Sequence, residues 1–331
     1  MSMRHLDRVT ADYTALHPEL VVASDRFVEL VRGIIDDAGI NYLTVSGRAK
    51  SVASFTGKAR RLRAELGEEA DLHRVITDQV GVRVITYVLS DVVAVAELLS
   101  EQLTVLDDRD MGQETAREGR FGYASRHLLV SLDPPVDGRP PAYDPLRCAS
   151  VQVRTVLQHA WAEFEHDTRY KGTIPPEQVP DLDRRFTLAA GLLELADKEF
   201  GAIRDQLQAG LSGEPVAEDR DAGVGPRELA TFLAGRYANA GWSRTEQYEW
   251  IEGILDELGL RTLDDLSAAL RDVDSAAVTR SMDYKYPPGA VRRLDDDLLS
   301  AFGEGYLDLP GNARRREALA GRLTRISGLR S

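Results

Sequence analysis

Residues 151–172 restrict the fold of this chain more than any other segment, because a short strand-like run leads there directly into a long amphipathic helix. At its start, valines alternate with Gln152 and Arg154, which is typical of a strand with one polar face. The helical part carries ionisable side chains four and three residues apart, and therefore on one face: His159, Glu163 and His166. They could bind zinc, but the HExxH pattern is absent, and bonds to neighbouring loops are the simpler explanation.

Strand-like and helical patterns alternate along the first two-thirds of the chain, which implies an α/β or α+β arrangement around one sheet. The strands are expected at residues 40–46, 81–89, 105–109, 125–132 and 150–155. The helices are expected at residues 24–38, 51–66, 91–103, 156–170 and 183–209. Gly39 should end the first helix, and Asp91 should cap the third.

Residues 210–226 are poor in large apolar groups and rich in Gly, Pro and acid, which predicts a linker between two domains. The first domain is then residues 1–209. Residues 227–331 have the pattern of several helices broken by glycine and proline. This helical domain could cap the first one, bind a partner protein or form a homo-oligomer. Arginines near the C-terminus are better explained by a solvated helix face than by an RNA contact.

Charge and cysteine content exclude several functions. The net charge of −13 disfavours non-specific binding to nucleic acid or to an anionic membrane. The single cysteine, Cys148, excludes an internal disulfide and argues against a cysteine-based zinc site. No apolar run has the length of a signal core or a membrane span. These observations predict a soluble cytoplasmic protein with no membrane partner.

Residues 48–63 stand out against this acidic background, because they contain six basic residues and no acidic one. Helical spacing places one polar set on a single face: Lys50, Ser54, Lys58 and Arg61. An apolar set shares the other side: Val52, Phe55, Ala59 and Leu62. A strand and a glycine followed by such a helix could hold a polyphosphate, because helix N-termini and basic side chains both favour anions. An ordinary basic surface helix is the alternative.

Two further groups of polar residues lie at predicted strands. Asp78 precedes a strand expected to be buried, and Arg83 lies within it. The two could bind Mg²⁺ and a nucleotide, or they could form structural salt bridges with each other or with other residues. Tyr123 and His127 lie at the start of another strand. A tyrosine there can stack on a base and a histidine can bind phosphate, although a plain turn before a strand explains the pattern equally well.

Four motifs in order resemble the synthetase domain of the RelA/SpoT family over roughly residues 20–205. They are Gly47-Arg48-Ala49-Lys50, the run from Asp78 to Arg83, the run from Gly122 to His127, and the run from Gln152 to His166. The resemblance implies an α+β fold with a mixed sheet flanked by helices, related to nucleotidyltransferases. It also implies transfer of pyrophosphate from ATP to the ribose 3′-hydroxyl of GDP or GTP, with Mg²⁺.

The resemblance also assigns roles by position. Arg48 and Arg83 should hold the adenine, and Asp78 should ligate Mg²⁺. The ATP phosphates should be bound by Lys50, Ser54, Lys58 and Arg61. The acceptor nucleotide should be bound by Tyr123, His127, Gln152 and His159. Phosphoryl-type transfer relies mainly on positioning and charge neutralisation, which suits such a set.

One position departs from the family pattern. Two residues before Gln152 the family carries a glutamate that binds Mg²⁺ and is proposed to activate the acceptor, whereas this chain has Ser150. Serine is a poor base and a weak metal ligand. Three hypotheses follow: a pyrophosphokinase making guanosine alarmones, a toxin-type relative acting on another acceptor such as the 3′ end of tRNA, and a catalytically impaired protein that only binds nucleotide.

Overall fold

The computed structural model describes residues 2–67, 69–112, 114, 125–171, 178–211, 224–237, 240, 243 and 245–328. The chain divides into two compact units. The first comprises Met1–Ile35 and Tyr42–Gly201, and the second comprises Asp36–Asn41 and Ala202–Ser331. Most of the predicted linker, residues 212–223, lies outside the described residues. No helix in the described ranges is both long and apolar enough to cross a membrane.

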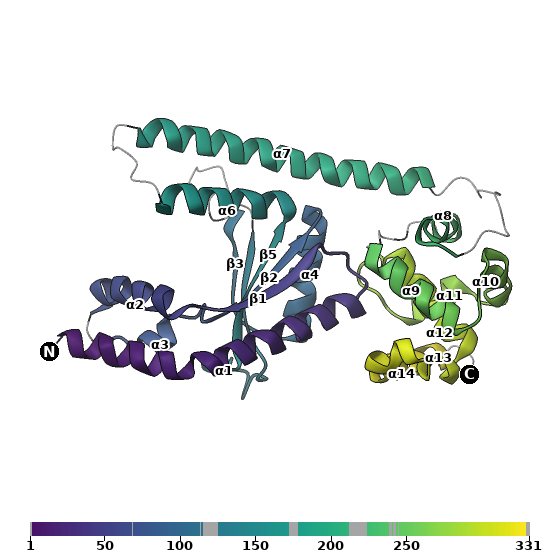
Figure 1. Ribbon diagram of the computed structural model, residues 1–331, viewed down its shortest axis with the longest axis horizontal. Coiled ribbons are helices and arrows are strands. Elements are labelled where there is room, and N and C mark those ends of the chain that lie inside the picture. Colours follow the sequence, from purple (N-terminus) through teal and green to yellow (C-terminus); the bar gives the residue numbers. More distant parts are fainter. Residues whose placement is uncertain are drawn as a thin grey trace. The chain divides into compact units, whose positions relative to one another are not determined.

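The first unit is built on a five-stranded sheet in the order β1-β2-β5-β4-β3 (Figure 1). Strands β2 and β5 are parallel, and the other neighbours are antiparallel. The strands are β1 (Thr44–Ala49), β2 (Val80–Thr86), β3 (Thr104–Asp110), β4 (Arg126–Ser131) and β5 (Cys148–Thr155). The α+β class with a mixed sheet flanked by helices is therefore confirmed.

Six helices among the described residues belong wholly or mostly to this unit. They are α1 (Ser2–Asp37), α2 (Val52–Leu66), α3 (Leu72–Val75), α4 (Leu89–Gln102), α6 (Val156–Lys171) and α7 (Val179–Leu211). The N-terminal helix is much longer than the expected residues 24–38, but it ends as predicted before Gly39, whose φ of 67° suits glycine.

The predicted boundaries of two strands are also wrong. The first strand begins at Thr44, four residues later than expected, and the second ends at Thr86. The apolar residues after Thr86 start α4 instead of continuing the strand, so Asp91 lies in the first turn of that helix and does not cap it. Apolar runs alone cannot separate a buried strand from the start of a buried helix.

The two faces of the sheet differ in chemistry. One face carries valine and leucine side chains that are almost fully buried: Val82, Val84, Leu128, Val130, Val151 and Val153. Gly47 points to this face, and a Cβ on it would lie 2.5 Å from Val28 Cγ2 and 2.6 Å from Ser24 Oγ of α1. Glycine at this position therefore lets α1 approach β1. The other face carries the polar side chains of the candidate site.

The second unit is helical, as predicted for residues 227–331. Its helices are α8 (Pro226–Arg236), α9 (Thr245–Glu257), α10 (Leu263–Ala269), α11 (Ser275–Ser281), α12 (Ala290–Phe302), α13 (Glu304–Leu307) and α14 (Arg316–Ser327), with a 3₁₀ helix at Pro310–Arg315. An apolar core of its own includes Leu229, Ile251, Leu266, Leu294 and Leu319.

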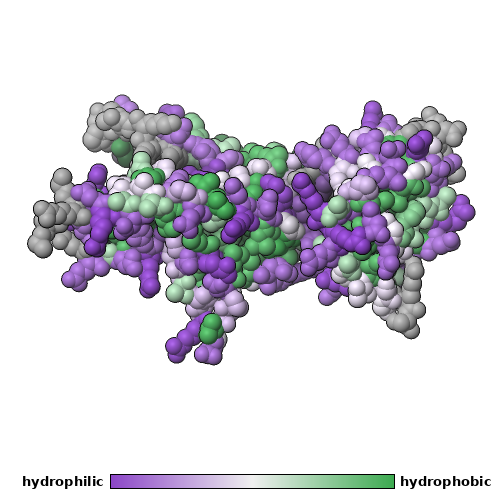
Figure 2. Space-filling view, turned by 60° about the horizontal axis from the view of Figure 1, so that its bottom comes forward, coloured by the Kyte–Doolittle hydropathy of each residue, from purple (hydrophilic) through white to green (hydrophobic). Residues whose placement is uncertain are grey.

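Hydrophobic residues gather in the middle of the first unit on the face drawn in Figure 2.

A buried ion network crosses the core of the helical unit. Asp295, Asp296 and Asp297 follow one another in α12, and their exposed fractions are 1%, 2% and 1%. Asp295 accepts hydrogen bonds from Tyr306 Oη at 2.7 Å, Arg315 Nη2 at 2.6 Å and Arg322 Nη1 at 2.8 Å. The further bonds of the network are Arg322 to Asp296, Tyr284 to Asp296, and Tyr237 and Ser275 to Asp297.

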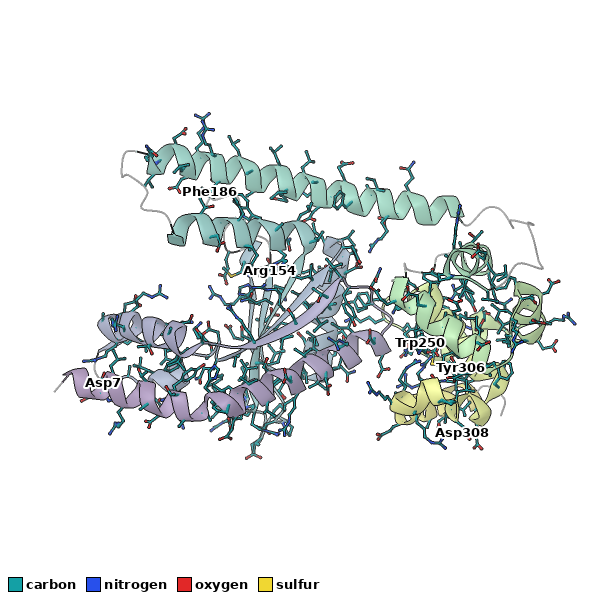
Figure 3. All side chains as sticks on the ribbon, in the orientation of Figure 1. Asp7, Arg154, Phe186, Trp250, Tyr306 and Asp308 are labelled. Atoms are coloured by element: carbon teal, nitrogen blue, oxygen red, sulfur yellow. The ribbon has the colours of Figure 1, made fainter. Side chains whose placement is uncertain are left out.

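This network corrects the interpretation of the C-terminal arginines as a solvated face for two of them, whereas Arg314, Arg316 and Arg325 are exposed as predicted. Arg322 is buried and Arg315 is mostly covered, with its guanidinium 4.5 Å from the centre of the Trp250 ring. Figure 3 shows Trp250 and Tyr306 in this unit. Three consecutive aspartates among apolar residues were the sign in the sequence that arginines are buried here. Carboxylates in such a helix become buried, and buried carboxylates need counter-charges.

The helical unit also holds the segment between α1 and β1. Arg292 of α12 donates to the carbonyl oxygens of Asp36 at 3.2 Å and Asp37 at 2.6 Å. These carbonyls lie at the end of α1, where the helix continues no further, and the carbonyl of Asp36 also accepts from the N–H of Gly39 at 3.1 Å. Arg292 therefore caps α1 from a position more than 250 residues later in the sequence.

Candidate active site

The strand register aligns polar side chains from all five strands in one row. Residues paired directly across neighbouring strands point to the same face of a sheet. The successive pairs place five residues side by side: Ser46, Arg83, Gln152, His127 and Arg109. The next row on this face consists of Arg48, Gly81, Ser150, Leu129 and Asp107. The fold thus brings together on one surface residues that are far apart in the sequence.

Asp78 lies between two lysines from the predicted basic segment. Lys50 Nζ is 2.7 Å from Asp78 Oδ2, and Lys58 Nζ is 3.0 Å from Oδ1. Burial raises the pKa of Asp78, but the hydrogen bonds and charges of both lysines outweigh it and hold the pKa below its usual value. The carboxylate is therefore ionised at neutral pH, and the two ammonium groups converge on one point.

The start of α2 is fixed from two sides. Ser51 is its N-cap and accepts from the backbone N–H of Ser54, while the two serine hydroxyls are 2.9 Å apart. Tyr13 of α1 donates to the carbonyl of Lys50 at 2.7 Å, and its ring stacks on Phe55 with ring centres 3.8 Å apart. Burial and the charge of Asp78 raise the pKa of Tyr13 to about 12, so the hydroxyl remains a donor.

The predicted basic face is only partly formed. Lys50 precedes the N-cap and is not part of the helix, yet it reaches the same carboxylate as Lys58. Ser54 takes part in the cap, and Arg61 is exposed. The apolar set is placed as expected, with Phe55 and Ala59 buried. The close approach of α1 accounts for Gly47, which was predicted to precede a helix that holds a polyphosphate.

Arg83 pairs with α6 and not with Asp78. Its Nη1 is 3.1 Å from Glu163 Oε1, and His159 Nδ1 is 3.7 Å from the same oxygen. The alternative of structural salt bridges therefore holds for both residues, but with other partners, since Asp78 pairs with Lys50 and Lys58. Burial and the positive charge of Arg83 lower the pKa of His159, and Glu163 opposes them. The His166 side chain lies outside the described residues, and the described part contains no cluster of three or more potential metal ligands.

His127 is held as a neutral imidazole. Burial, followed by the charges of Arg154 and Arg109, lowers its pKa to about 4. Its Nε2 lies 3.0 Å from Ser125 Oγ. Arg154, seen beside α6 in Figure 3, donates to Gln152 Oε1 at 3.0 Å. The neutral ring can therefore exchange hydrogen bonds with a ligand without adding charge.

The junction of β5 and α6 is a capping box that sequence analysis missed. Thr155 Oγ1 accepts from the N–H of Gln158 at 3.1 Å, and Gln158 Oε1 accepts from the N–H of Thr155 at 2.9 Å. The threonine hydroxyl then donates to the buried carboxylate of Asp197 at 2.8 Å. Burial raises the pKa of Asp197. The spacing Thr-x-x-Gln was a usable signal, whereas nothing in the sequence connected Asp197 with this turn.

Ser150 occupies the polar face between Gly81 and Leu129. Gly81 contributes no side chain, and a Cβ there would lie 3.8 Å from Arg48 Cγ. Asp107 is the one carboxylate in the row of Ser150, two strands away, and Glu163 is bonded to Arg83 in the neighbouring row. Tyr123, which was predicted to stack on the acceptor nucleobase, and the loop around it lie outside the described residues.

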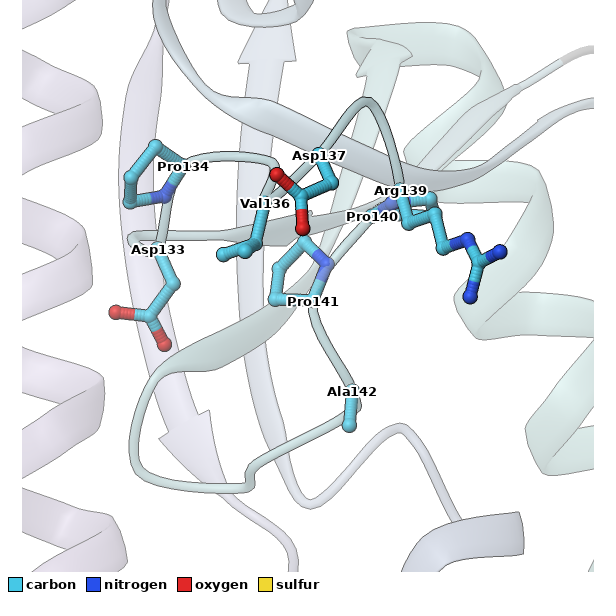
Figure 4. A pocket seen from close by; sticks show the side chains of 8 residues that line it. All are labelled: Asp133, Pro134, Val136, Asp137, Arg139, Pro140, Pro141 and Ala142. Carbon is cyan, nitrogen blue, oxygen red and sulfur yellow. The ribbon is translucent and has the colours of Figure 1, made fainter.

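A surface hollow of about 860 Å³ lies elsewhere, against the loop between β4 and β5 (Figure 4). It is lined by Asp133, Pro134, Val136, Asp137, Arg139, Pro140, Pro141 and Ala142. This loop follows the end of β4, whereas His127 lies near the start of that strand. None of the predicted site residues lines the hollow, so we do not assign the site to it.

Comparison with known proteins identifies relatives of the region that contains these residues. A family profile described as "Region found in RelA / SpoT proteins" matches residues 47–174. The GTP pyrophosphokinase YjbM of Bacillus subtilis is 31% identical over 222 residues, which cover 63% of this chain and 92% of the relative. The GTP pyrophosphokinase YwaC of the same organism is 29% identical over 163 residues, which cover 48% of this chain and 72% of the relative.

Solved structures give similar matches. The small alarmone synthetase 1 from Bacillus subtilis aligns with a TM-score of 0.47 and 25% identity, covering 60% of this chain and 98% of that one. A GTP pyrophosphokinase family protein from Streptococcus pneumoniae aligns with a TM-score of 0.46 and 24% identity, covering 60% and 95%.

Proposed function

The chain belongs to the RelA/SpoT family, and from this premise we propose that it transfers the β,γ-pyrophosphate of ATP to the 3′-hydroxyl of GDP or GTP. The observation that carries the proposal is the row of Arg83, Gln152 and His127 across three strands, next to the two lysines on Asp78. Cationic and neutral hydrogen-bonding groups face one surface, although the whole chain has a net charge of −13.

The proposed ATP site lies at β1, α2 and β2. Arg48 and Arg83 hold the adenine, because planar guanidinium groups stack on aromatic rings. The ammonium groups of Lys50 and Lys58 bind the phosphates, and Ser54 and Arg61 add donors farther along α2. Tyr123, His127, Gln152 and His159 bind the acceptor nucleotide.

Asp78 is a suitable ligand for Mg²⁺ only when nucleotide is bound. Mg²⁺ is commonly held by one or two carboxylates together with substrate phosphates, and Asp78 supplies one carboxylate. Both of its oxygens now accept from lysines, so the phosphates must share those lysines. The ion would neutralise charge on the phosphates. We expect calorimetry to detect Mg²⁺ binding with ATP present, and none with the ion alone.

In the proposed reaction, the acceptor 3′-oxygen forms a bond to the β-phosphorus, the bond from this phosphorus to the α,β-bridging oxygen breaks, and AMP leaves. Lys50, Lys58 and Arg83 keep the phosphates and the base in place and offset their negative charge. Gln152 and the neutral His127 orient the acceptor. The hydroxyl proton passes to solvent water, because Ser150 is poorly suited to accept it.

Ser150 supports a second candidate, a protein that binds nucleotide with little or no turnover. Loss of a general base commonly reduces a rate by roughly 10²–10⁴-fold. Ser150→Glu restores the carboxylate in a place where Gly81 leaves room beside it. We expect this variant to transfer pyrophosphate at least ~10²-fold faster than the natural chain. Ser267→Glu, on an exposed position of α10, is the matched control and should leave the rate unchanged.

The experiment uses the full chain with ATP labelled at the β-phosphate, Mg²⁺, and GDP, GTP or tRNA as acceptor. Labelled 3′-pyrophosphorylated GDP or GTP supports the proposal. Label on tRNA alone would mean a different acceptor. If neither the natural chain nor Ser150→Glu transfers label, while calorimetry detects ATP binding, the protein is a nucleotide-binding relative without this activity.

A further inference from the structure

Lys50 lies in the short link that joins β1 to α2. The strand ends at Ala49 and the helix begins at Val52, so Lys50 belongs to neither element. Its side chain is nevertheless only 11% exposed and reaches Asp78. A lysine ammonium group is carried on a flexible stem, so it stays in one place most readily when the backbone below it is fixed.

Both polar groups of the Lys50 backbone are hydrogen-bonded to other elements. Its N–H donates to the carbonyl of Gln79 at 2.8 Å, and its carbonyl accepts from Tyr13 Oη at 2.7 Å. Gln79 directly follows Asp78, so the first bond ties Lys50 to the backbone beside its own ion-pair partner. The second bond comes from α1, which runs beside α2 (Figure 1).

Gln79 is itself a fixed point. Its side chain is fully buried, and its Nε2 donates to the carbonyl of His73 at 2.6 Å and to the carbonyl of Ile76 at 2.9 Å. The buried amide therefore ties the end of α3 to the residue after Asp78. Lys50 and Asp78 share this anchor, and Tyr13 supplies the other hydrogen bond to the backbone of Lys50.

The hydroxyl of Tyr13 is not needed for packing. The side chain is fully buried, and its ring lies parallel to that of Phe55 with centres 3.8 Å apart. A phenylalanine would fill the same space and stack in the same way, without a hydroxyl that is costly to bury unless it is hydrogen-bonded. Lys50 accepts the bond that this hydroxyl donates, so the polar end of Tyr13 serves the link and not the core.

We propose that Tyr13 is a positioning residue for ATP, because its hydroxyl fixes the backbone of Lys50 so that the ammonium group meets the phosphates beside Asp78. This inference rests on the proposed function, in which Lys50 binds phosphate. A donor that is ordered before the ligand arrives loses less conformational entropy on binding, which raises affinity. Without the hydroxyl the link gains freedom, while α2 keeps its N-cap at Ser51 and its contact with the Tyr13 ring.

Tyr13→Phe removes the hydroxyl and leaves the ring. Calorimetry with Mg²⁺ present should show ATP binding weakened about fivefold or more, which corresponds to the loss of one hydrogen bond. The affinity for GDP or GTP should not change, because the proposed acceptor residues lie on other elements. Tyr248→Phe is the matched control, since it removes a partly buried hydroxyl that bonds to Ser243 in the helical unit. If Tyr13→Phe binds ATP as tightly as the natural chain, the proposal is overturned.

Two further backgrounds separate positioning from a general loss of structure. In a Lys50→Ala chain no ammonium group remains to be positioned, so adding Tyr13→Phe should weaken ATP binding no further. In a Lys58→Ala chain Lys50 is still present, and the loss of about fivefold should persist. A purely structural hydroxyl would give the same loss in both backgrounds, and that result would contradict a role through Lys50.

Hydrogen exchange of the Lys50 amide tests the anchor without any ligand. This N–H is bonded to the carbonyl of Gln79, and in Tyr13→Phe it should exchange about fivefold faster or more. The urea midpoint should change little. Unchanged exchange would overturn the positioning role alone, whatever the natural chain binds. A natural chain that binds no ATP would overturn the proposed function and, with it, the ligand named here, so the two failures are distinct.

Discussion

Arginine, lysine and aspartate side chains gather in two regions of this protein. The two regions differ in how far these side chains are buried and in how completely their charges are paired. In the helical unit, three consecutive aspartates are buried and each is bonded to arginine, tyrosine or serine. On the polar face of the sheet, Arg48, Arg83, Arg109 and the two lysines outnumber the carboxylates bonded to them, and most are partly exposed.

The difference separates structural charge from charge available to a ligand. A buried charge must be matched within the protein, because no solvent compensates it. A partly exposed cation can exchange water or a weak partner for a phosphate at little loss. The number of charged residues in a region therefore says less about function than their burial and matching.

The largest expected effect is in the helical unit. Asp295→Asn leaves Arg315 and Arg322 without their carboxylate, which should reduce the stability of this unit by about 3–5 kcal/mol. Hydrogen exchange of the α12 amides measures the change. Asp308→Asn is the control, because its ion pair with Arg316 is 61–62% exposed, and it should change stability by less than about 1 kcal/mol. If Asp295→Asn and Asp308→Asn reduce stability equally, the buried network contributes no more to stability than an exposed ion pair.

A smaller effect should come from the sheet, through pH. The pKa of His127 is lowered to about 4, whereas an unfolded histidine titrates near 6.5. Between these values the unfolded chain binds a proton that the folded protein does not. The stability linked to His127 is thus complete above pH ~6.5 and falls by up to about 3 kcal/mol as the pH drops to ~4. His127→Gln should flatten urea-unfolding stability over this window; an unchanged slope would mean that the imidazole is not held neutral.

The smallest effect should be on ligand binding. Lys58→Ala removes one of the two ammonium groups at Asp78 and should weaken ATP about tenfold, or about 1.4 kcal/mol, with little change in stability. Lys198→Ala, which breaks an exposed pair with Glu194 on α7, is the control. Calorimetry at several salt concentrations measures both. If the two variants bind ATP equally well, Lys58 is an ordinary surface residue.

Much of the sheet could be predicted because its strands carry β-branched residues at a period of two. Gln152, Arg154 and the valines between them identified β5 and its polar face, and the strand was found where expected. Strand order and register could not be predicted. They depend on pairings between segments far apart in the sequence, so the row from Ser46 to Arg109 emerges only in three dimensions.

The partners of charged residues are the feature of this protein that its sequence predicts least well. A salt bridge of Arg83 was an open alternative with no partner predicted, and the partner is Glu163. Lys50 joins Lys58 at Asp78 although Lys50 lies outside α2. Helical spacing predicts neighbours within one helix and says nothing about side chains that meet from different elements. For the same reason, the contact of Asp197 with Thr155 could not be predicted. The burial of Arg315 and Arg322 against Asp295 could not be predicted either.

The cap that Arg292 places on the end of α1 has a consequence for how the chain is made. Residues 36–41 leave the ribosome early, yet the side chain that satisfies the carbonyls of Asp36 and Asp37 is synthesised some 250 residues later. Until then the carbonyl of Asp37 lacks this donor, and the carbonyl of Asp36 has only the N–H of Gly39 as its partner within the stretch. Cutting the gene at the linker would therefore not yield two self-sufficient modules, since the downstream piece would lack six of its own residues and the upstream piece would carry them without their anchor.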